Sequence, residues 1–141
     1  LLENIKLNNI TNIIPFNCAV SQNSSKVKIF LNDDQSSHSM FIPNSESIEV
    51  PSISIHDIFK ENEIKKCDLL KLDCEGAEYD IIKSIKQEFF GFINKIAIEY
   101  HFADSKPDLL EELVKKLKKS FFHITTRELF SDIGFLFATR K

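Results

Sequence analysis

The sequence predicts an α/β fold in which a mixed, mainly parallel sheet carries helices on its faces. Two apolar runs, residues 69–72 and 95–100, have the length and composition of buried strands. Each is followed by apolar residues at helical spacing, and this alternation of strand and helix is typical of α/β proteins. Two further runs, residues 121–126 and 134–139, predict final strands around a short turn.

The composition is that of an ordinary globular domain. The 141 residues fit one domain with a real core, since 43% are hydrophobic, and the formal net charge is −3. This mild acidity argues against a dedicated nucleic-acid binder, and no apolar run approaches the roughly 20 residues that span a bilayer. The three cysteines form no Cys-x-x-Cys pair, which favours free thiols. We therefore expect no nucleic-acid or membrane partner and a cytoplasmic location.

The first half of the chain predicts two helical segments and three strands. Residues 1–9 have the pattern of a helix end that stops at two asparagines. Three runs predict strands: residues 13–20, 26–31 and 47–54. The polar residues 32–39 predict a loop over the site, because they lack periodicity. A short helix is expected at residues 54–62.

The second half of the chain alternates strands with helices. Apolar contacts of the helix after residues 69–72 are expected from Ala77, Ile81, Ile82 and Ile85. After the strand at residues 95–100, Ser105 is expected as the N-cap and Pro107 in the first turn of the next helix. That helix has apolar residues at helical spacing as far as position 117.

Two carboxylates at the end of the strand at residues 69–72 are candidates for function. Asp73 and Glu75 would lie outside the carboxyl end of this strand, where open α/β sheets bind their ligands. Carboxylates in such a place need a partner, because burying an unpaired charge is costly. A purely structural alternative is that Glu75 caps the following helix and Glu78 complements its dipole.

The end of the next strand offers a candidate general base. Imidazole titrates near neutrality, which makes His101 a candidate. Its strand end would neighbour Asp73, and Glu99 would orient His101 or contact a substrate. The alternative is that both are partly exposed residues at a strand end. Together with Asp73 and Glu75 they could also ligate a divalent metal. Sequence spacing fixes no such geometry, so we predict no metal site.

The same residues carry a resemblance to a known family. Residues 68–79 resemble the central motif of the FkbM-type S-adenosylmethionine-dependent methyltransferases, which has two leucines, Lys, Ile or Leu, Asp, any residue, and Glu-Gly-Ala-Glu. Residues 96–101 resemble the next strand of that family, which ends in Glu, an apolar or aromatic residue, and His. Residues 2–8 resemble the helix end before its third core strand, so the likeness spans most of the chain.

This resemblance implies a Rossmann-like methyltransferase fold with an antiparallel terminal strand. It implies methyl transfer from S-adenosylmethionine to a hydroxyl of a sugar, glycan or secondary metabolite, so the partner would be a small-molecule or glycan acceptor. Asp73 and Glu75 would sit beside the methionine end of the cofactor or the acceptor, and Asp73 would also bind the cofactor. Asn17, Cys18 and Ala19 would lie where related folds meet the adenine, with Asn17 reaching the exocyclic amine.

The front of such a domain is missing from this sequence. These methyltransferases open with a strand, a glycine-rich turn and a second strand that ends in an acid. The chain has only Gly76, Gly91 and Gly134, and it begins inside a predicted helix. We therefore expect residues 1–141 to be the later part of a methyltransferase domain, inactive alone. Without the first strands one sheet edge would stand open, which favours an oligomer.

Two other functions are compatible with the same residues. A noncatalytic α/β remnant would keep the fold and bind a partner through its open edge. A methyltransferase acting on nucleic acid or protein would carry an Asn-Pro-Pro-Tyr or Asp-Pro-Pro-Tyr type of motif after the strand at residues 69–72. The chain instead has Asp73-Cys74-Glu75-Gly76 at that place, which favours a hydroxyl acceptor.

Overall fold

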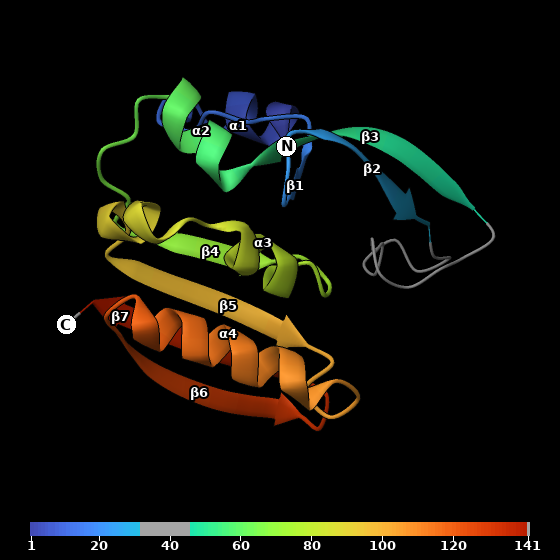
Figure 1. The fold of residues 1–141 in the computed structure, drawn as a ribbon. Coiled ribbons are helices and arrows are strands. Elements are labelled where there is room, and N and C mark those ends of the chain that lie inside the picture. The colour runs from blue at the N-terminus through green and yellow to red at the C-terminus, as the bar shows by residue number, and fades with distance from the viewer. Residues whose placement is uncertain (32–45, 141) are drawn as a thin grey trace.

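The computed structural model of the chain describes residues 1–31 and 46–140 (Figure 1). The predicted loop at residues 32–39 lies outside this described part. The described residues form two sheets, of three and four strands, together with several helices. No helix among them is long and apolar enough to cross a membrane. The three cysteines are all unpaired.

The first sheet contains the strands β1 (Ala19–Ser21), β2 (Ser25–Phe30) and β3 (Ser47–Ser54). Its order is β1-β3-β2, with β1 parallel and β2 antiparallel to β3. The helices α1 (Leu2–Leu7) and α2 (Ile55–Glu61) lie at the end of this sheet where β1 and β3 meet (Figure 1). The predicted helix end, the two later strands and the short helix are therefore confirmed.

The predicted buried strand at residues 13–20 is wrong over most of its length. β1 begins only at Ala19, and Ile13, Ile14 and Phe16 are 45%, 77% and 49% exposed. No described strand pairs with residues 13–18, and Pro15 has no N–H to donate to a ladder. An apolar run without a partner strand leaves its backbone polar groups unpaired, so the run forms no strand here.

The second sheet contains the strands β4 (Leu70–Asp73), β5 (Lys95–His101), β6 (Phe122–Phe130) and β7 (Ile133–Arg140). Its order is β4-β5-β7-β6. β4 is parallel to β5, while β5–β7 and β6–β7 are antiparallel, which confirms the expected antiparallel terminal pair. Only two of the five strand pairs in the described part of the chain are parallel, so the described sheets are mixed rather than mainly parallel.

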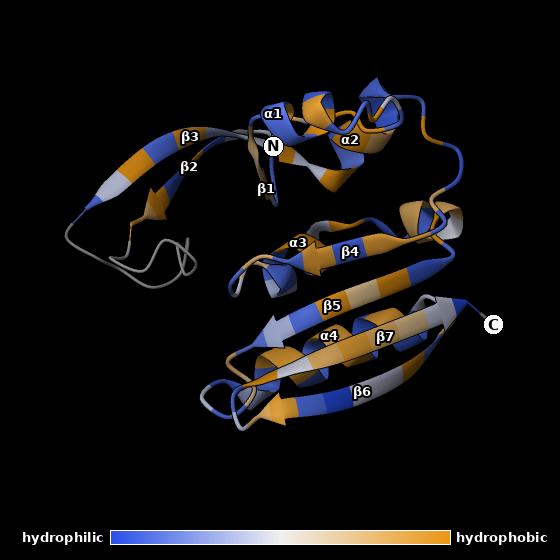
Figure 2. Ribbon diagram, turned by 180° about the vertical axis from the view of Figure 1, so that it is seen from behind, coloured by the Kyte–Doolittle hydropathy of each residue, from blue (hydrophilic) through white to orange (hydrophobic). Residues whose placement is uncertain are grey.

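Helices cover one face of the four-stranded sheet. α3 (Glu78–Ser84), a 3₁₀ helix at Gln87–Phe92 and α4 (Pro107–Lys119) follow the predicted strand–helix alternation. α3 and α4 lie on the same side of the sheet (Figure 1), and the view from behind shows no helix over the other side (Figure 2). The core forms on the covered side, from Leu72, Ile81, Ile82, Ile96, Ile98, Leu113, Leu117, Phe122 and Leu136 among others.

Two expectations about individual residues of this half are wrong. Leu69 is 57% exposed, because β4 is an edge strand with a single partner among the described strands and begins one residue later. Ser105 is not the N-cap of α4, a place taken by Lys106. The backbone N–H and hydroxyl of Ser105 instead donate to the carboxylate of Asp132 in the β6–β7 turn. Pro107 opens the helix as expected.

Candidate functional site

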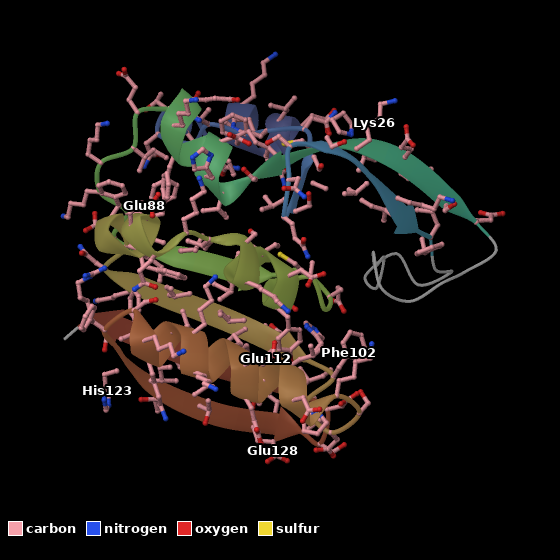
Figure 3. The ribbon with its side chains drawn as sticks, in the orientation of Figure 1. Lys26, Glu88, Phe102, Glu112, His123 and Glu128 are labelled. Carbon is pink, nitrogen blue, oxygen red and sulfur yellow. The ribbon has the colours of Figure 1, made fainter. Side chains whose placement is uncertain are left out.

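The turn after β4 has an unusual backbone conformation. Glu75 and Gly76 take positive φ angles of 51° and 103°. Left-handed backbone is open to glycine but costs energy for a residue with a Cβ, so the turn is strained at Glu75. A Cβ at position 76 would also overlap the ring of Phe102. Phe102 follows β5 and lies at the same end of the sheet (Figure 3), so the close approach of these two segments requires glycine.

The buried carboxylate of Glu78 holds this turn together. Glu78 is the first residue of α3 and is 0% exposed. Its Oε1 accepts the backbone N–H of Cys74 at 2.6 Å, and its Oε2 accepts the backbone N–H of Gly76 at 2.9 Å. Hydrogen bonds to an ionised acceptor are the strong kind, and they offset part of the cost of burying the charge.

His101 ends β5 with its imidazole between two carboxylates. The side chain is 8% exposed, its Nδ1 lies 3.3 Å from Oε1 of Glu78, and its Nε2 lies 3.5 Å from Oε2 of Glu75. Nδ1 is close enough for an ion pair but makes no hydrogen bond in this geometry. The carboxylate of Glu78 raises the pKa of His101 above its ordinary value, burial opposes this, and the charges of Glu75 and Glu99 add to it.

Asp73 and Glu99 are directly opposite each other on β4 and β5. Like charges in this arrangement repel, and the ammonium of Lys71, 3.0 Å from Oδ2 of Asp73, relieves part of that repulsion. One ligand atom from each of Asp73, Glu99 and His101 lies within 4.8 Å of the others, close enough to hold one divalent ion. Since Lys71 already supplies a cation, we assign no metal here.

The structure therefore brings together the four residues expected to carry the chemistry. Asp73 and Glu75 lie at the carboxyl end of β4, and Glu99 and His101 at the carboxyl end of the neighbouring β5. Both strand ends are on the same side because β4 and β5 are parallel. The alternative in which His101 is a partly exposed strand-end residue is wrong, because its imidazole is buried.

The three expected adenine contacts lie at the amino end of β1, whereas the predicted strand at residues 13–20 would have placed them near its carboxyl end. Asn17 is exposed, and Asn17 and Cys18 precede β1, whose first residue is Ala19. They therefore stand at the amino end of the strand, because the strand starts six residues later than expected. Its carboxyl end instead leads into a cavity of about 520 Å³ beside the start of α3. Residues that line this cavity are Ser21, Gln22, Asn23, Ser25, Lys28, Ala77 and Asp80, among others.

Sequence reasoning missed two residues that shape the site. Glu78 was considered only in the structural alternative, as a complement to the dipole of α3. It does lie in the first turn of that helix, but its carboxylate also binds the turn after β4 and faces the imidazole. Tyr79 is buried, and its hydroxyl donates to the backbone carbonyl of His101. Burial raises the pKa of this phenol, so it stays protonated and can donate. In the sequence, the pattern that could have pointed to these two residues is an acid followed by a tyrosine directly after Glu-Gly-Ala.

Comparisons with known proteins identify the family. A family model of the methyltransferase FkbM domain matches residues 2–135, which is most of the chain. No curated protein and no solved structure matches. The matched region contains both strand ends, the strained turn and the buried Glu78–His101 contact described above. The chain therefore belongs to the FkbM methyltransferase domain family.

Proposed function

We propose that this domain transfers a methyl group from S-adenosylmethionine to a hydroxyl of a sugar, glycan or other small molecule. The observation that carries the proposal is the buried imidazole of His101, which stands between carboxylates at the end of β5, beside Asp73 at the end of β4. A hydroxyl acceptor needs a group that takes its proton, and imidazole is suited to this near neutral pH.

The carboxylates at the end of β4 and the cavity beside the start of α3 have the chemistry needed to bind S-adenosylmethionine. The cofactor carries a cationic sulfonium and an ammonium, and Asp73 and Glu75 supply carboxylates that stay 40% and 37% exposed. The cavity beside the start of α3 is lined by polar residues, among them Ser21, Asn23 and Asp80, and by apolar ones such as Val27 and Ile81. This mixed lining suits a nucleoside, which has an apolar ring face as well as hydroxyls and nitrogens. When bound, S-adenosylmethionine supplies an electrophilic methyl group for an in-line displacement.

The other residues of the site would then take the acceptor proton and position the reactants. His101 accepts the hydroxyl proton of the acceptor at Nε2, the nitrogen that faces the partly exposed Glu75. The imidazolium that forms is stabilised by the carboxylates of Glu75 and Glu78. Asp73 and Glu99 orient the reactants across the two strand ends, which contributes by positioning rather than by bond making.

The cysteines and the turn after β4 bear on the location and on the class of acceptor. We propose a reducing, cytoplasmic location because all three cysteines are unpaired. A hydroxyl acceptor is favoured over an amine of nucleic acid or protein by the acidic turn that follows β4, Asp73-Cys74-Glu75-Gly76. This turn lacks the prolines and tyrosine of the amine-directed motif.

Calorimetric titration of S-adenosylmethionine and S-adenosylhomocysteine into the protein as its gene encodes it tests this function. We expect both to bind, Asp73→Ala to weaken binding about tenfold or more, and His101→Gln to leave binding intact. His101→Gln should lower methyl transfer to any accepted sugar by about 10²-fold or more. The exposed His123→Gln is the matched control and should change neither. If neither ligand binds, the assignment is wrong and a noncatalytic module becomes the better account.

A further inference from the structure

We propose that Glu78 is a positioning residue that holds the Nδ1 proton of His101, so that Nε2 is the nitrogen left to act as the base. This inference rests on the proposed function, in which His101 takes the proton of a hydroxyl. It assigns to a buried side chain of α3 the task of fixing both the tautomer and the orientation of the imidazole.

The carboxylate of Glu78 is held in place by contacts other than the one to the imidazole. The side chain of Glu78 is fully buried. Burying a carboxylate costs free energy unless hydrogen bonds replace those that it made to water. Two backbone N–H groups, of Cys74 and Gly76, supply such bonds, one to each oxygen. Because both donors belong to the strained turn, the carboxylate cannot rotate away without breaking that turn.

One oxygen of Glu78 has room for a second donor. A carboxylate can accept about four hydrogen bonds, and the backbone bonds use one on each oxygen. Oε1 accepts from Cys74 and also lies 3.3 Å from Nδ1 of His101. Catalytic hydrogen bonds are often long in the absence of substrate and tighten in the reacting complex. We expect a rotation of the imidazole in the reacting complex to complete this bond.

The groups around the imidazole leave Nε2 for catalysis. Glu78 faces Nδ1 from α3, and Glu75 faces Nε2 from the turn after β4. Glu99, two residues earlier on β5, and Asp132, in the β6–β7 turn, add electrostatic contacts. Glu78 is 0% exposed and Glu75 is 37% exposed on its side chain, so Nε2 faces the side that a substrate can reach. A proton kept on Nδ1 leaves Nε2 as the acceptor.

The neighbour of Glu78 fixes the backbone of the same histidine. Tyr79, the next residue of α3, donates its hydroxyl to the backbone carbonyl of His101. The first two residues of the helix thus hold the ring and the main chain of His101 separately. Two independent contacts from one helix end are the arrangement expected of residues that orient a base rather than react themselves.

Nitrogen-15 NMR of the histidine rings in the full-length protein tests the proposal without an activity assay. The His101 signals are assigned by their loss in His101→Gln. In the wild-type protein we expect the neutral His101 ring to carry its proton on Nδ1 and its pKa to lie above the ordinary value of about 6.5. In Glu78→Gln the pKa should fall and the preference for the Nδ1 tautomer should be lost. In the control Glu75→Gln the pKa should fall less and the tautomer should remain.

Kinetics provide the second measurement. Because the base must be deprotonated, kcat should rise with pH through the raised pKa of His101, and in Glu78→Gln this rise should move to lower pH. Glu78→Gln should lower kcat about 10- to 100-fold with KM nearly unchanged.

Two results would overturn the role of Glu78. One is a wild-type ring that carries its neutral proton on Nε2, which decides the matter even if Glu78→Gln does not fold. The other is a folded Glu78→Gln with unchanged tautomer and pKa. Failure of the proposed function would look different, because S-adenosylmethionine would not bind while the NMR result for His101 stood.

Discussion

At the scale of single residues, two features of the structure require glycine at position 76. Its φ of 103° suits glycine, and the Phe102 ring occupies the space that a Cβ would need. We expect Gly76→Ala to destabilise the fold by about 2 kcal/mol, from backbone strain and overpacking together. Gly91→Ala is the control, because no heavy atom from outside its own helix and its chain neighbours lies within 4 Å of its Cβ position. It should change stability by less than about 1 kcal/mol. Urea unfolding measures both, and equal losses would contradict the argument.

The candidate site could be predicted from the sequence only in part. Asp73, Glu75, Glu99 and His101 were expected near one another, and they are, because each follows or ends an apolar run whose strand type is readable from periodicity. The role of Glu78 could not be found in this way. It depends on a turn with left-handed backbone, which points two N–H groups at the carboxylate. The hydrophobic periodicity of a sequence does not predict where φ is positive.

At the scale of secondary-structure elements, α2 begins with a cap that also connects it to the first sheet. Ser54 Oγ accepts the backbone N–H of Asp57 at 3.1 Å and donates to the carboxylate of Asp57 at 2.7 Å. The hydroxyl of Ser24 donates to the same carboxylate and accepts the backbone N–H of Ser54. The hydroxyls of Ser24 and Ser54, with His56, lower the pKa of Asp57 to about 2. This network connects the start of the helix to the β1–β2 turn.

Removal of the Ser54 cap should lower the stability of the protein through the start of α2. Ser54→Ala should destabilise the protein by about 1 kcal/mol, because the N–H of Asp57 loses its acceptor at the helix start. Ser131→Ala, an exposed serine of the β6–β7 turn, should stay within about 0.5 kcal/mol of the wild type. Thermal and urea unfolding test the pair. A Ser54→Ala variant as stable as Ser131→Ala would show that the cap contributes nothing.

Elements were predicted well where the pattern alone determines them. The helix at Ile55–Glu61 and the strand at Ile133–Arg140 lie where periodicity and end signals place them. The strand at Phe122–Phe130 begins as predicted but continues beyond residue 126, where it was expected to end. The run at residues 13–20 shows the limit, because an apolar segment becomes a strand only if another strand pairs with it. Pairing is a tertiary property that a local pattern does not contain.

At the scale of the whole molecule, the expected α/β fold is confirmed in its coarse form. The sheets are separate and mixed in the described part, and β1 and β4 each have one partner strand there. The prediction that an open edge favours an oligomer stays a prediction. The parallel pairing of β4 with β5, the next strand along the chain, was expected from the sequence. The order of the first sheet was not, because β1 pairs with β3 rather than with β2, the next strand.

The pH dependence of global stability follows from two groups with opposite shifts. The pKa of Asp57 is lowered to about 2, so its contribution is present above the unfolded value of about 3.9 and lost as pH falls towards 2. The pKa of His101 is raised, so its contribution is present below the unfolded value of about 6.5 and lost as pH rises through the folded value. These groups favour maximal stability between about pH 4 and 6.5.

The free energy of unfolding in urea, measured from pH 2 to 9, checks this prediction. The loss above neutral pH should disappear in His101→Gln and persist in His123→Gln. A wild-type protein that grows more stable from pH 6 to 8 would contradict the sign given for His101.

The contact between Asp132 and the segment after His101 has a consequence for local opening. The carboxylate of Asp132 accepts the backbone N–H groups of Asp104 and Ser105, and its carbonyl accepts that of Ala103. Three consecutive amides next to the proposed base are thus protected by one residue of the β6–β7 turn. In hydrogen exchange these amides should open together with the terminal hairpin rather than with α4, so the last two strands control how long the segment after the proposed base keeps its hydrogen bonds.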